Sequence, residues 1–152
     1  MSRPVLKLAP PALPAVRMAT NHDGPQIAVL LCNAGWDVSV MAFIDWHDIY
    51  PYWLVAEQPA RGDASIVGCI QISISKPIGY MELLAIDRRI PKTEQAVLVK
   101  ALCYAAMGTL KRSGATMAGG MITFDDKSWK NILKRRGAVV LGSGNKFVKR
   151  LV

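Results

Sequence analysis

The sequence lacks any apolar run close to the roughly 20 residues that a helix needs to span a bilayer. It also lacks a signal-peptide core, because residues 5–14 are interrupted by three prolines. We therefore expect no membrane association, and we expect a cytoplasmic protein in whichever bacterial or phage-infected cell makes it.

Cysteine and histidine are scarce. The three cysteines, Cys32, Cys69 and Cys103, form no CxxC pair, and His22 and His47 stand alone. No spacing typical of metal ligands results. We expect reduced thiols, no disulfide and no metal site.

Acidic residues are few in the second part of the chain. Residues 1–87 hold five basic and eight acidic side chains, whereas residues 88–152 hold fourteen basic and three acidic ones. Such asymmetry is typical of a surface for an acidic partner such as a nucleotide, a nucleic acid or an acidic protein. The plainer alternative is a solvated basic surface that aids solubility.

At 152 residues the chain suits one domain with a sizeable core. Residues 1–15 are proline-rich and predict an arm that is flexible or docked on a neighbour; residues 16–152 form the expected domain. Periodicity and turn residues predict the first elements: strands over 16–20, 52–57 and 65–75, and a helix over 26–33.

Residues 79–122 predict a right-handed parallel βαβ unit. Its strands cover 79–87 and 115–122, and the helix runs from Glu94 to Arg112, with Thr93 as N-cap and Gly114 as the left-handed residue after its end. The turn before the helix carries the three cations Arg88, Arg89 and Lys92. Free amides beside cations favour a phosphate or carboxylate site, although most helix starts of this kind bind nothing.

In the remaining chain, the capping and apolar patterns predict a helix that begins after Asp125 or Asp126 and ends at Gly137. Strands over 138–141 and 146–152 follow, joined by a turn over 142–145.

This order of elements resembles the GNAT superfamily of N-acetyltransferases over about residues 15–152. Residues 16–20 with Asp23 resemble the family's opening R-x-A-T-x-x-D pattern, and residues 82–86 resemble its fourth strand. Residues 52–57 with 66–69 resemble its second and third strands, and residues 131–137 resemble the end of its late helix.

The resemblance implies an α/β fold: a mixed, mostly antiparallel sheet whose fourth and fifth strands are parallel and splayed, with helices on both faces. It implies acetyl-coenzyme A, or coenzyme A, in the cleft between those strands. The implied cofactor-binding residues are Leu84, Ala85, Ile86, Arg88, Arg89, Lys92, Thr93, Glu94, Gln95 and Asp125.

The chain departs from the family pattern at several positions. Lys92 and Glu94 stand where the phosphate loop has glycines, and no glycine occurs between Tyr80 and Met107. Leu133 stands where the family has a tyrosine acid. Ala138 replaces a phenylalanine, and Asp125 lies where an asparagine is common.

Amine acylation requires a base, and Glu82 is the candidate. We expect burial in its apolar strand to raise the pKa of its carboxyl; Tyr80 and His47 are reserves. The alternative is that Glu82 pairs with Arg88 or Arg89, or faces solvent.

Aromatic residues lie where the family shapes its acceptor site, although core packing is their commoner fate. The acceptor candidates are Trp46, His47, Tyr50 and Trp53.

Three functions are compatible with the sequence. The first is an acyl-coenzyme A-dependent N-acyltransferase that moves acetyl from acetyl-coenzyme A to an amine. The second is a catalytically degenerate protein of the same fold, such as a phage virion or internal head component, whose arm contacts a virion partner or further copies of the chain. The third is a basic nucleic-acid-binding protein, which the clustered cations favour and the missing reading helix opposes.

Overall fold

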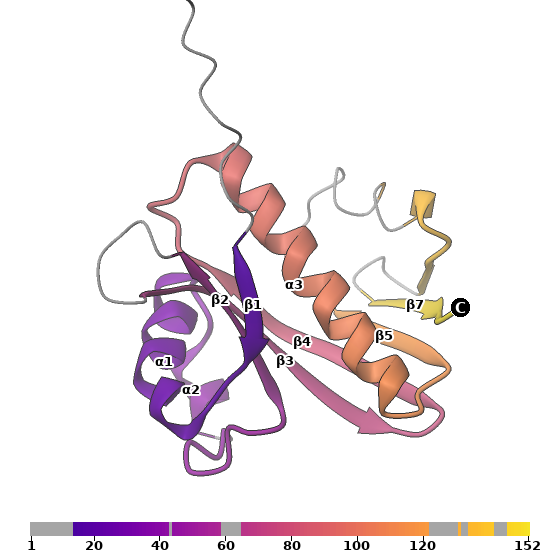
Figure 1. Cartoon of the computed structure of the whole chain (residues 1–152), viewed down its shortest axis with the longest axis horizontal. Helices are drawn as coiled ribbons and strands as arrows, with labels where there is room; N and C mark the ends of the chain where they lie inside the picture. The colour runs from indigo at the N-terminus through magenta and orange to yellow at the C-terminus, as the bar shows by residue number, and fades with distance from the viewer. Residues whose placement is uncertain (1–13, 43, 59–64, 122–130, 132–133, 142–145) are drawn as a thin grey trace, which may run out of the picture.

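A computed structural model gives the fold and describes residues 14–42, 44–58, 65–121, 131, 134–141 and 146–152 (Figure 1). Most of the expected arm, Asp125 and the predicted turn over 142–145 lie outside these residues. The elements in chain order are β1 (Ala15–Met18), the short 3-10 helix η1 (Asn21–Asp23), α1 (Gly24–Asn33), α2 (Val38–Met41), β2 (Trp53–Gln58), β3 (Ser65–Ser75), β4 (Ile78–Ile86), α3 (Lys92–Arg112), β5 (Met117–Met121), β6 (Val139–Leu141) and β7 (Lys146–Arg150).

Among the described residues, seven strands form one mixed sheet in the order β1-β2-β3-β4-β5-β7-β6. Every neighbouring pair is antiparallel except β4 and β5, which run parallel. Parallel neighbours need a crossover connection, and α3 provides it. The expected α/β fold, mostly antiparallel with one βαβ unit, is confirmed.

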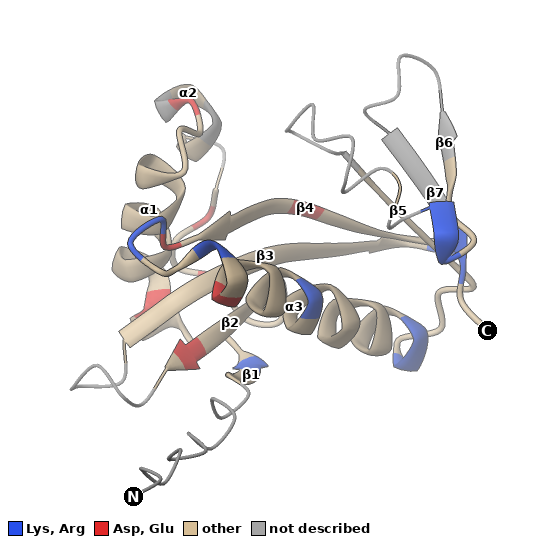
Figure 2. Ribbon diagram, turned by 90° about the horizontal axis from the view of Figure 1, so that it is seen from above, with Lys and Arg blue, Asp and Glu red and all other residues tan. Residues whose placement is uncertain are grey.

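Helices cover both faces of the sheet. Figure 2 shows α3 against one face and α1 with α2 on the other, at the end formed by β1 to β4. The alternation of β2 follows from this layering: Leu54 and Ala56 pack in the core on the α3 side, whereas Trp53 and Val55 pack in the core on the α1 side. A strand buried on both faces is apolar at consecutive positions.

The residues of the opening motif hold β1 to the start of α1. The Arg17 guanidinium donates to both carboxylate oxygens of Asp23, at 2.8 and 3.0 Å, and to Glu57 on β2 at 2.7 Å. Asp23 also accepts from the Thr20 amide at 2.7 Å. Hydrogen bonds from Arg17 lower the pKa of the Asp23 carboxyl below its ordinary value, against the opposing effect of burial.

The start of α3 differs from the prediction. The helix begins at Lys92 with Pro91 as its cap residue, so Thr93 is not the N-cap. The Pro91 carbonyl accepts hydrogen bonds from the amides of Glu94 and Gln95, both at 2.9 Å. The Pro91 nitrogen carries no hydrogen, so this position has no amide donor that needs a partner. At the other end Gly114 has φ of 90°, which confirms it as the left-handed residue after the helix.

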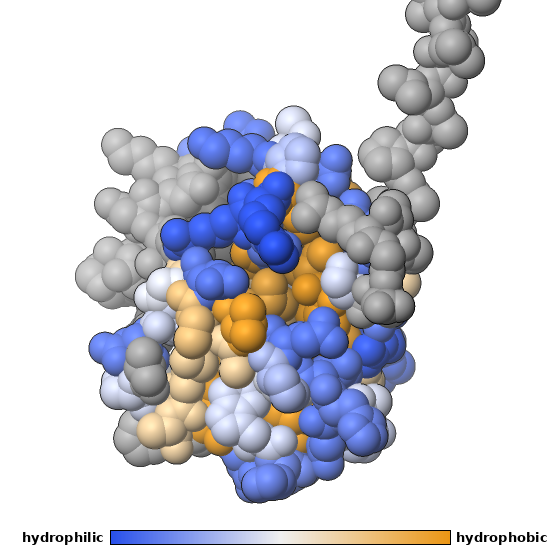
Figure 3. All heavy atoms as spheres, turned by 90° about the vertical axis from the view of Figure 1, so that its left-hand side faces the viewer, coloured by the Kyte–Doolittle hydropathy of each residue, from blue (hydrophilic) through white to orange (hydrophobic). Residues whose placement is uncertain are grey.

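Within the described part of the chain, no helix is long and apolar enough to cross a membrane. The longest of the described helices, α3, has 21 residues, of which five are charged. Figure 3 shows the side of the molecule that carries α1: hydrophilic residues dominate the coloured surface, and apolar atoms are exposed mainly near its centre.

Candidate active site

β4 separates from β5 halfway along its length. The parallel pairing runs from Ile78 opposite Met117 to Met81 opposite Gly120, and residues 82–86 of β4 lie beyond the last pair. β4 also bulges here, because Gln71 of β3 faces Glu82 whereas Cys69 faces Ala85. Leu83, in the bulge, has φ of 48°. Bulges redirect a strand, and this one lies where β4 leaves its parallel neighbour.

The freed edge of β4 carries backbone groups that can pair with an extended ligand. The Asp87 amide donates to the Val67 carbonyl of β3 at 2.9 Å, so the groups of the preceding residue, Ile86, point away from β3. Leu84 also directs its carbonyl away from β3, and the Trp36 indole reaches it at 3.4 Å. Ala85, opposite Cys69, directs its groups toward β3. Three β4 residues were expected to bind the cofactor, and the backbone groups of two of them, Leu84 and Ile86, therefore face the opening.

The start of α3 provides unbonded amides. Within the described residues, the amides of Lys92 and Thr93 donate to no acceptor, and both residues are exposed. The first amides of a helix point along its axis and carry its positive dipole end. This helix start can therefore bind an anion, as its sequence predicts.

The two arginines before α3 are already engaged. Arg89 folds back on the largely buried carboxylate of Asp87, with its Nη2 at 2.8 Å from Oδ2. Arg88 donates to the Ala34 carbonyl at the end of α1, at 2.7 Å. Of the three cations in the turn, Lys92 is the one with no ion pair or hydrogen bond from its side chain to a described residue.

The side chains of Glu94 and Gln95 form hydrogen bonds with residues near the same turn. The Gln95 side-chain amide donates to the Ile90 carbonyl at 2.6 Å and holds the turn against the helix. The Glu94 carboxylate accepts from the Gln58 side chain, at the end of β2, at 3.3 Å. This contact directs the negative charge of Glu94 toward β2.

Glu82 lies at the apex of the opening, as the first β4 residue after the last pair with β5. Its neighbour Met81 is buried in the core on the α3 side, so the Glu82 side chain belongs to the α1 face. Glu82 is exposed, and the expectation that it is buried is wrong. Figure 2 shows that α1 covers one end of β4 and does not extend over its middle. It pairs with neither Arg88 nor Arg89, whose partners are Ala34 and Asp87.

Polar neighbours of Glu82 lie on the same face. Gln71 faces Glu82 across the ladder, and Ser73 faces Tyr80 two pairs further along, which is the next pair on the same face. Gln71, Ser73 and Tyr80 are all partly exposed. These four side chains form a polar patch beside the opening, in which a carboxylate stands among neutral hydrogen-bonding groups.

The four predicted acceptor residues do not come together. Trp53 is 1% exposed and belongs to the core. Tyr50 lines a groove on the α3 side of the sheet, opposite the face that carries Glu82. Trp46 packs partly buried in the core on the α1 side, close to Gly24, and His47 beside it is exposed.

Trp36 also lies at the edge of the opening, although it is not among the four acceptor candidates. The signal in the sequence was only its membership of the aromatic stretch after α1. Its contact with Leu84 joins residues 48 positions apart. Spacing along the chain carries no information about such a contact.

The cysteines are unpaired: Cys69 is buried, Cys103 is partly buried and Cys32 is exposed. Burial raises the pKa of both the Cys69 and the Cys103 thiols to about 12. No group of three or more histidine, cysteine or carboxylate side chains that could hold a metal occurs among the residues that the structure describes.

Comparison with solved structures finds this fold in N-acetyltransferases. The ribosomal-protein-S18-alanine N-acetyltransferase of Escherichia coli matches with a TM-score of 0.70 at 10% identity, over 91% of this chain and 94% of that chain. The GNAT family N-acetyltransferase YhbS of Escherichia coli, solved in complex with CoA, matches with a TM-score of 0.67 at 18% identity, over 95% and 86% of the two chains. A Mycobacterium tuberculosis protein in complex with CoA matches with a TM-score of 0.70 at 14% identity, over 91% and 100%.

At these identities the likeness shows the fold, and the chain has the divergent GNAT fold that its motifs resemble. No family model and no curated protein matches the sequence.

Proposed function

We propose that this protein is an acyl-coenzyme A-dependent N-acyltransferase that transfers acetyl from acetyl-coenzyme A to an amine. One observation carries the proposal: residues 82–86 of β4, which have no partner in the described part of β5, lead through the turn at 87–91 to a helix start whose first two amides donate to no described acceptor. An extended amide-bearing arm and a diphosphate are the two parts of coenzyme A that such a combination suits.

The chain's own groups for the cofactor follow from this geometry. The backbones of Leu84 and Ile86 would pair with the amides of the pantetheine arm, and the amides of Lys92 and Thr93 would donate to the diphosphate. Lys92 stands where the family's phosphate loop has a glycine, and its ammonium would add a positive charge beside the diphosphate. When bound, the cofactor supplies an acyl group activated as a thioester. Arg88 and Arg89 shape the turn through their contacts with Ala34 and Asp87.

Glu82 is the proposed base. Amine acceptors are protonated at neutral pH, and a carboxylate on the open face would both attract the ammonium and accept its proton. The neutral amine could then form the amide bond as the thioester C–S bond breaks and the coenzyme A thiolate leaves with a proton. Gln71 and Tyr80 lie on the same face and can hydrogen-bond the acceptor. Exposure of Glu82 in the free protein is compatible with this role, because a bound acceptor removes water from the patch.

Calorimetry with coenzyme A tests the cofactor site. The variant Lys92→Gln should weaken binding about tenfold, because one charge-assisted contact to phosphate is lost. Lys111→Gln is the matched control: it removes the same charge from the opposite end of the same helix. Equal affinities of the two variants, or no saturable binding to the unmodified protein, would refute the assigned site.

Turnover with acetyl-coenzyme A and a panel of primary amines tests Glu82. Glu82→Gln should lower kcat about a hundredfold or more while coenzyme A affinity is kept. A protein that binds coenzyme A but turns over no amine would support the alternative of a catalytically degenerate protein, in a virion or elsewhere. Full activity of Glu82→Gln would assign the base to another residue.

A further inference from the structure

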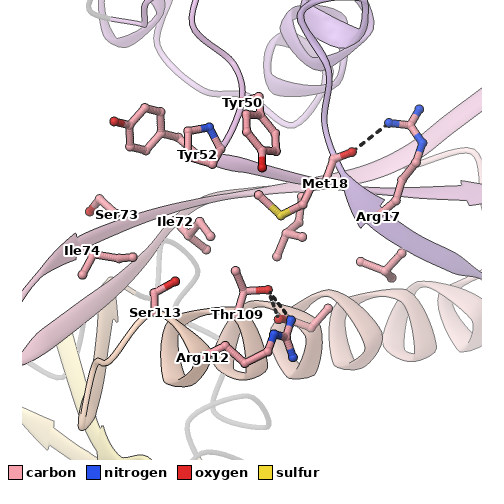
Figure 4. A pocket seen from close by; sticks show the side chains of 14 residues that line it. Arg17, Met18, Tyr50, Tyr52, Ile72, Ser73, Ile74, Thr109, Arg112 and Ser113 are labelled. Carbon is pink, nitrogen blue, oxygen red and sulfur yellow. Dashed lines mark hydrogen bonds between the residues drawn. The ribbon is translucent and has the colours of Figure 1, made fainter.

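A second concavity lies on the face of the sheet opposite Glu82. It is a groove of about 750 Å³ between the C-terminal half of α3 and the strands β1 to β3 (Figure 4). Leu54 and Ile72 in its wall belong to the core on the α3 side. The volume falls in the range of small-molecule sites. Ser73 of the polar patch lies at the edge of the groove, and Glu82, Gln71 and Tyr80 do not line it.

The walls of the groove are apolar and aromatic. Apolar surface comes from Met18, Leu54, Ile72 and Ile74. Tyr50 and Tyr52 lie on the side of the groove that faces α3 from across it. Tyr50 is 60% exposed and Tyr52 is 44% exposed. Tyrosine rings left open to a concave surface offer faces and edges for a planar ligand.

The charge of the groove is positive. Among the described residues that line it, none is acidic and two are cationic, Arg17 and Arg112. Arg17 is neutralised by Asp23 and Glu57, and Figure 4 shows its guanidinium pointing away from the groove. Arg112 has no carboxylate within ion-pair distance among the described residues.

The Arg112 guanidinium is held in position. It donates to the Thr109 hydroxyl oxygen at 3.1 Å, and this hydroxyl donates to the Ala105 carbonyl at 2.9 Å. The chain of hydrogen bonds uses one of the five guanidinium donors and leaves the others for a ligand. A fixed cation at the rim of an aromatic groove is suited to one anionic group on an apolar body.

We propose that this groove binds a small molecule with a planar apolar body and a single anionic group, such as an aromatic carboxylate, sulfonate or phosphate. The body lies against Tyr50, Tyr52 and Ile72, and the anion accepts hydrogen bonds from Arg112. The site is independent of the proposed cofactor site, which lies at the other end of α3.

The test uses two fluorescent probes that share a planar body. Anilinonaphthalene sulfonate carries one anionic group, and phenylnaphthylamine carries none. The folded wild-type protein should bind the sulfonate saturably and more tightly than the neutral probe. Arg112→Gln should weaken the sulfonate about five- to tenfold and leave the neutral probe unchanged. Tyr52→Ala should weaken both probes, because the wall that they share is lost.

Three controls separate this site from others. Lys111→Gln, the neighbouring exposed cation outside the groove, should leave both affinities unchanged. Saturating coenzyme A should not displace the sulfonate; displacement would mean that the probe occupies the cofactor site and would overturn the proposal. It is also overturned if Arg112→Gln and Lys111→Gln bind the sulfonate alike, or if sedimentation shows a dimer whose dissociation is required for probe binding. Failure of coenzyme A binding leaves this test intact, because neither probe depends on it.

Discussion

Arg88 and Ala34, 54 residues apart, are joined by a hydrogen bond of 2.7 Å from the arginine Nη2 to the carbonyl oxygen. The contact connects the end of α1 to the residues that follow β4. It also satisfies a carbonyl that the helix end leaves without an intrahelical donor. A side chain that the sequence offers as a phosphate ligand thus joins the end of α1 to the turn between β4 and α3.

Arg88→Gln should therefore affect folding more than cofactor binding. Loss of this hydrogen bond should lower the free energy of unfolding by about 1 kcal/mol, measured by urea denaturation. Coenzyme A affinity should fall less than in Lys92→Gln. The reverse order of affinities would show that Arg88 leaves Ala34 to bind phosphate.

Gly79→Ala should destabilise the protein by about 1–3 kcal/mol through overpacking. A Cβ at this position would lie 2.6 Å from a methyl group of Leu110, a fully buried residue of α3. The control is Gly24→Ala in the first turn of α1, where the nearest atoms are 3.7 Å away. That variant should be neutral or slightly stabilising, because alanine restricts the unfolded chain. Equal urea midpoints for the two variants would contradict the packing of α3 on β4.

The ion pair of Arg17 and Asp23 should make stability depend on pH. The folded state lowers the pKa of Asp23 below its ordinary 3.8. The stabilisation is therefore complete above the unfolded pKa and is lost as pH falls through the lower folded value. Asp23→Asn should cost about 2 kcal/mol at pH 7, and the difference from wild type should shrink below about pH 4.

The measurement for this pair is urea denaturation of both proteins across that pH range. Asp48→Asn is the control, since this exposed carboxylate has no ion pair among the described residues. A gap between wild type and Asp23→Asn that stays constant to pH 3 would argue against the charge of Asp23 as its source.

The three thiols should differ in reactivity. Burial raises the pKa of Cys69 and Cys103 to about 12, so at pH 8 almost no thiolate is present at either. Cys32 is exposed. A colorimetric thiol reagent should therefore titrate one thiol in the folded protein and all three in denaturant. Rapid reaction of two or three thiols without denaturant would contradict the burial of Cys69 and Cys103. Cys32→Ser should abolish the fast phase.

Much of the fold could be predicted because its signals are local. The apolar runs of β2, β3 and β4, the crossover length of α3 and the left-handed Gly114 are all properties of short segments. The start of α3 with its unbonded amides is local too, since a proline and the next two residues define it. Only the cap residue differed, because Pro91 starts the helix earlier than the apolar pattern indicates.

The site was harder to predict, since its members come from distant segments. Trp53 resembles an acceptor aromatic in the sequence, yet it is in the core because β2 is covered on both faces. Trp36 reaches Leu84, and Arg88 reaches Ala34, only after α1 has packed on the sheet. Glu82 is exposed because α1 stops short of the apex, which depends on packing and not on the apolar strand around it.

The sequence by itself determined the order of the strands and helices, the basic turn and the free helix start, since backbone preferences and apolar periodicity act over a few residues. Tertiary structure alone decided the bulge at Leu83, the separation of β4 from β5, and which of the cations and aromatics remain open to a ligand. The physical reason is that each of these depends on which side chains compete for the same space and the same hydrogen bonds, and packing brings those competitors together from positions far apart in the chain.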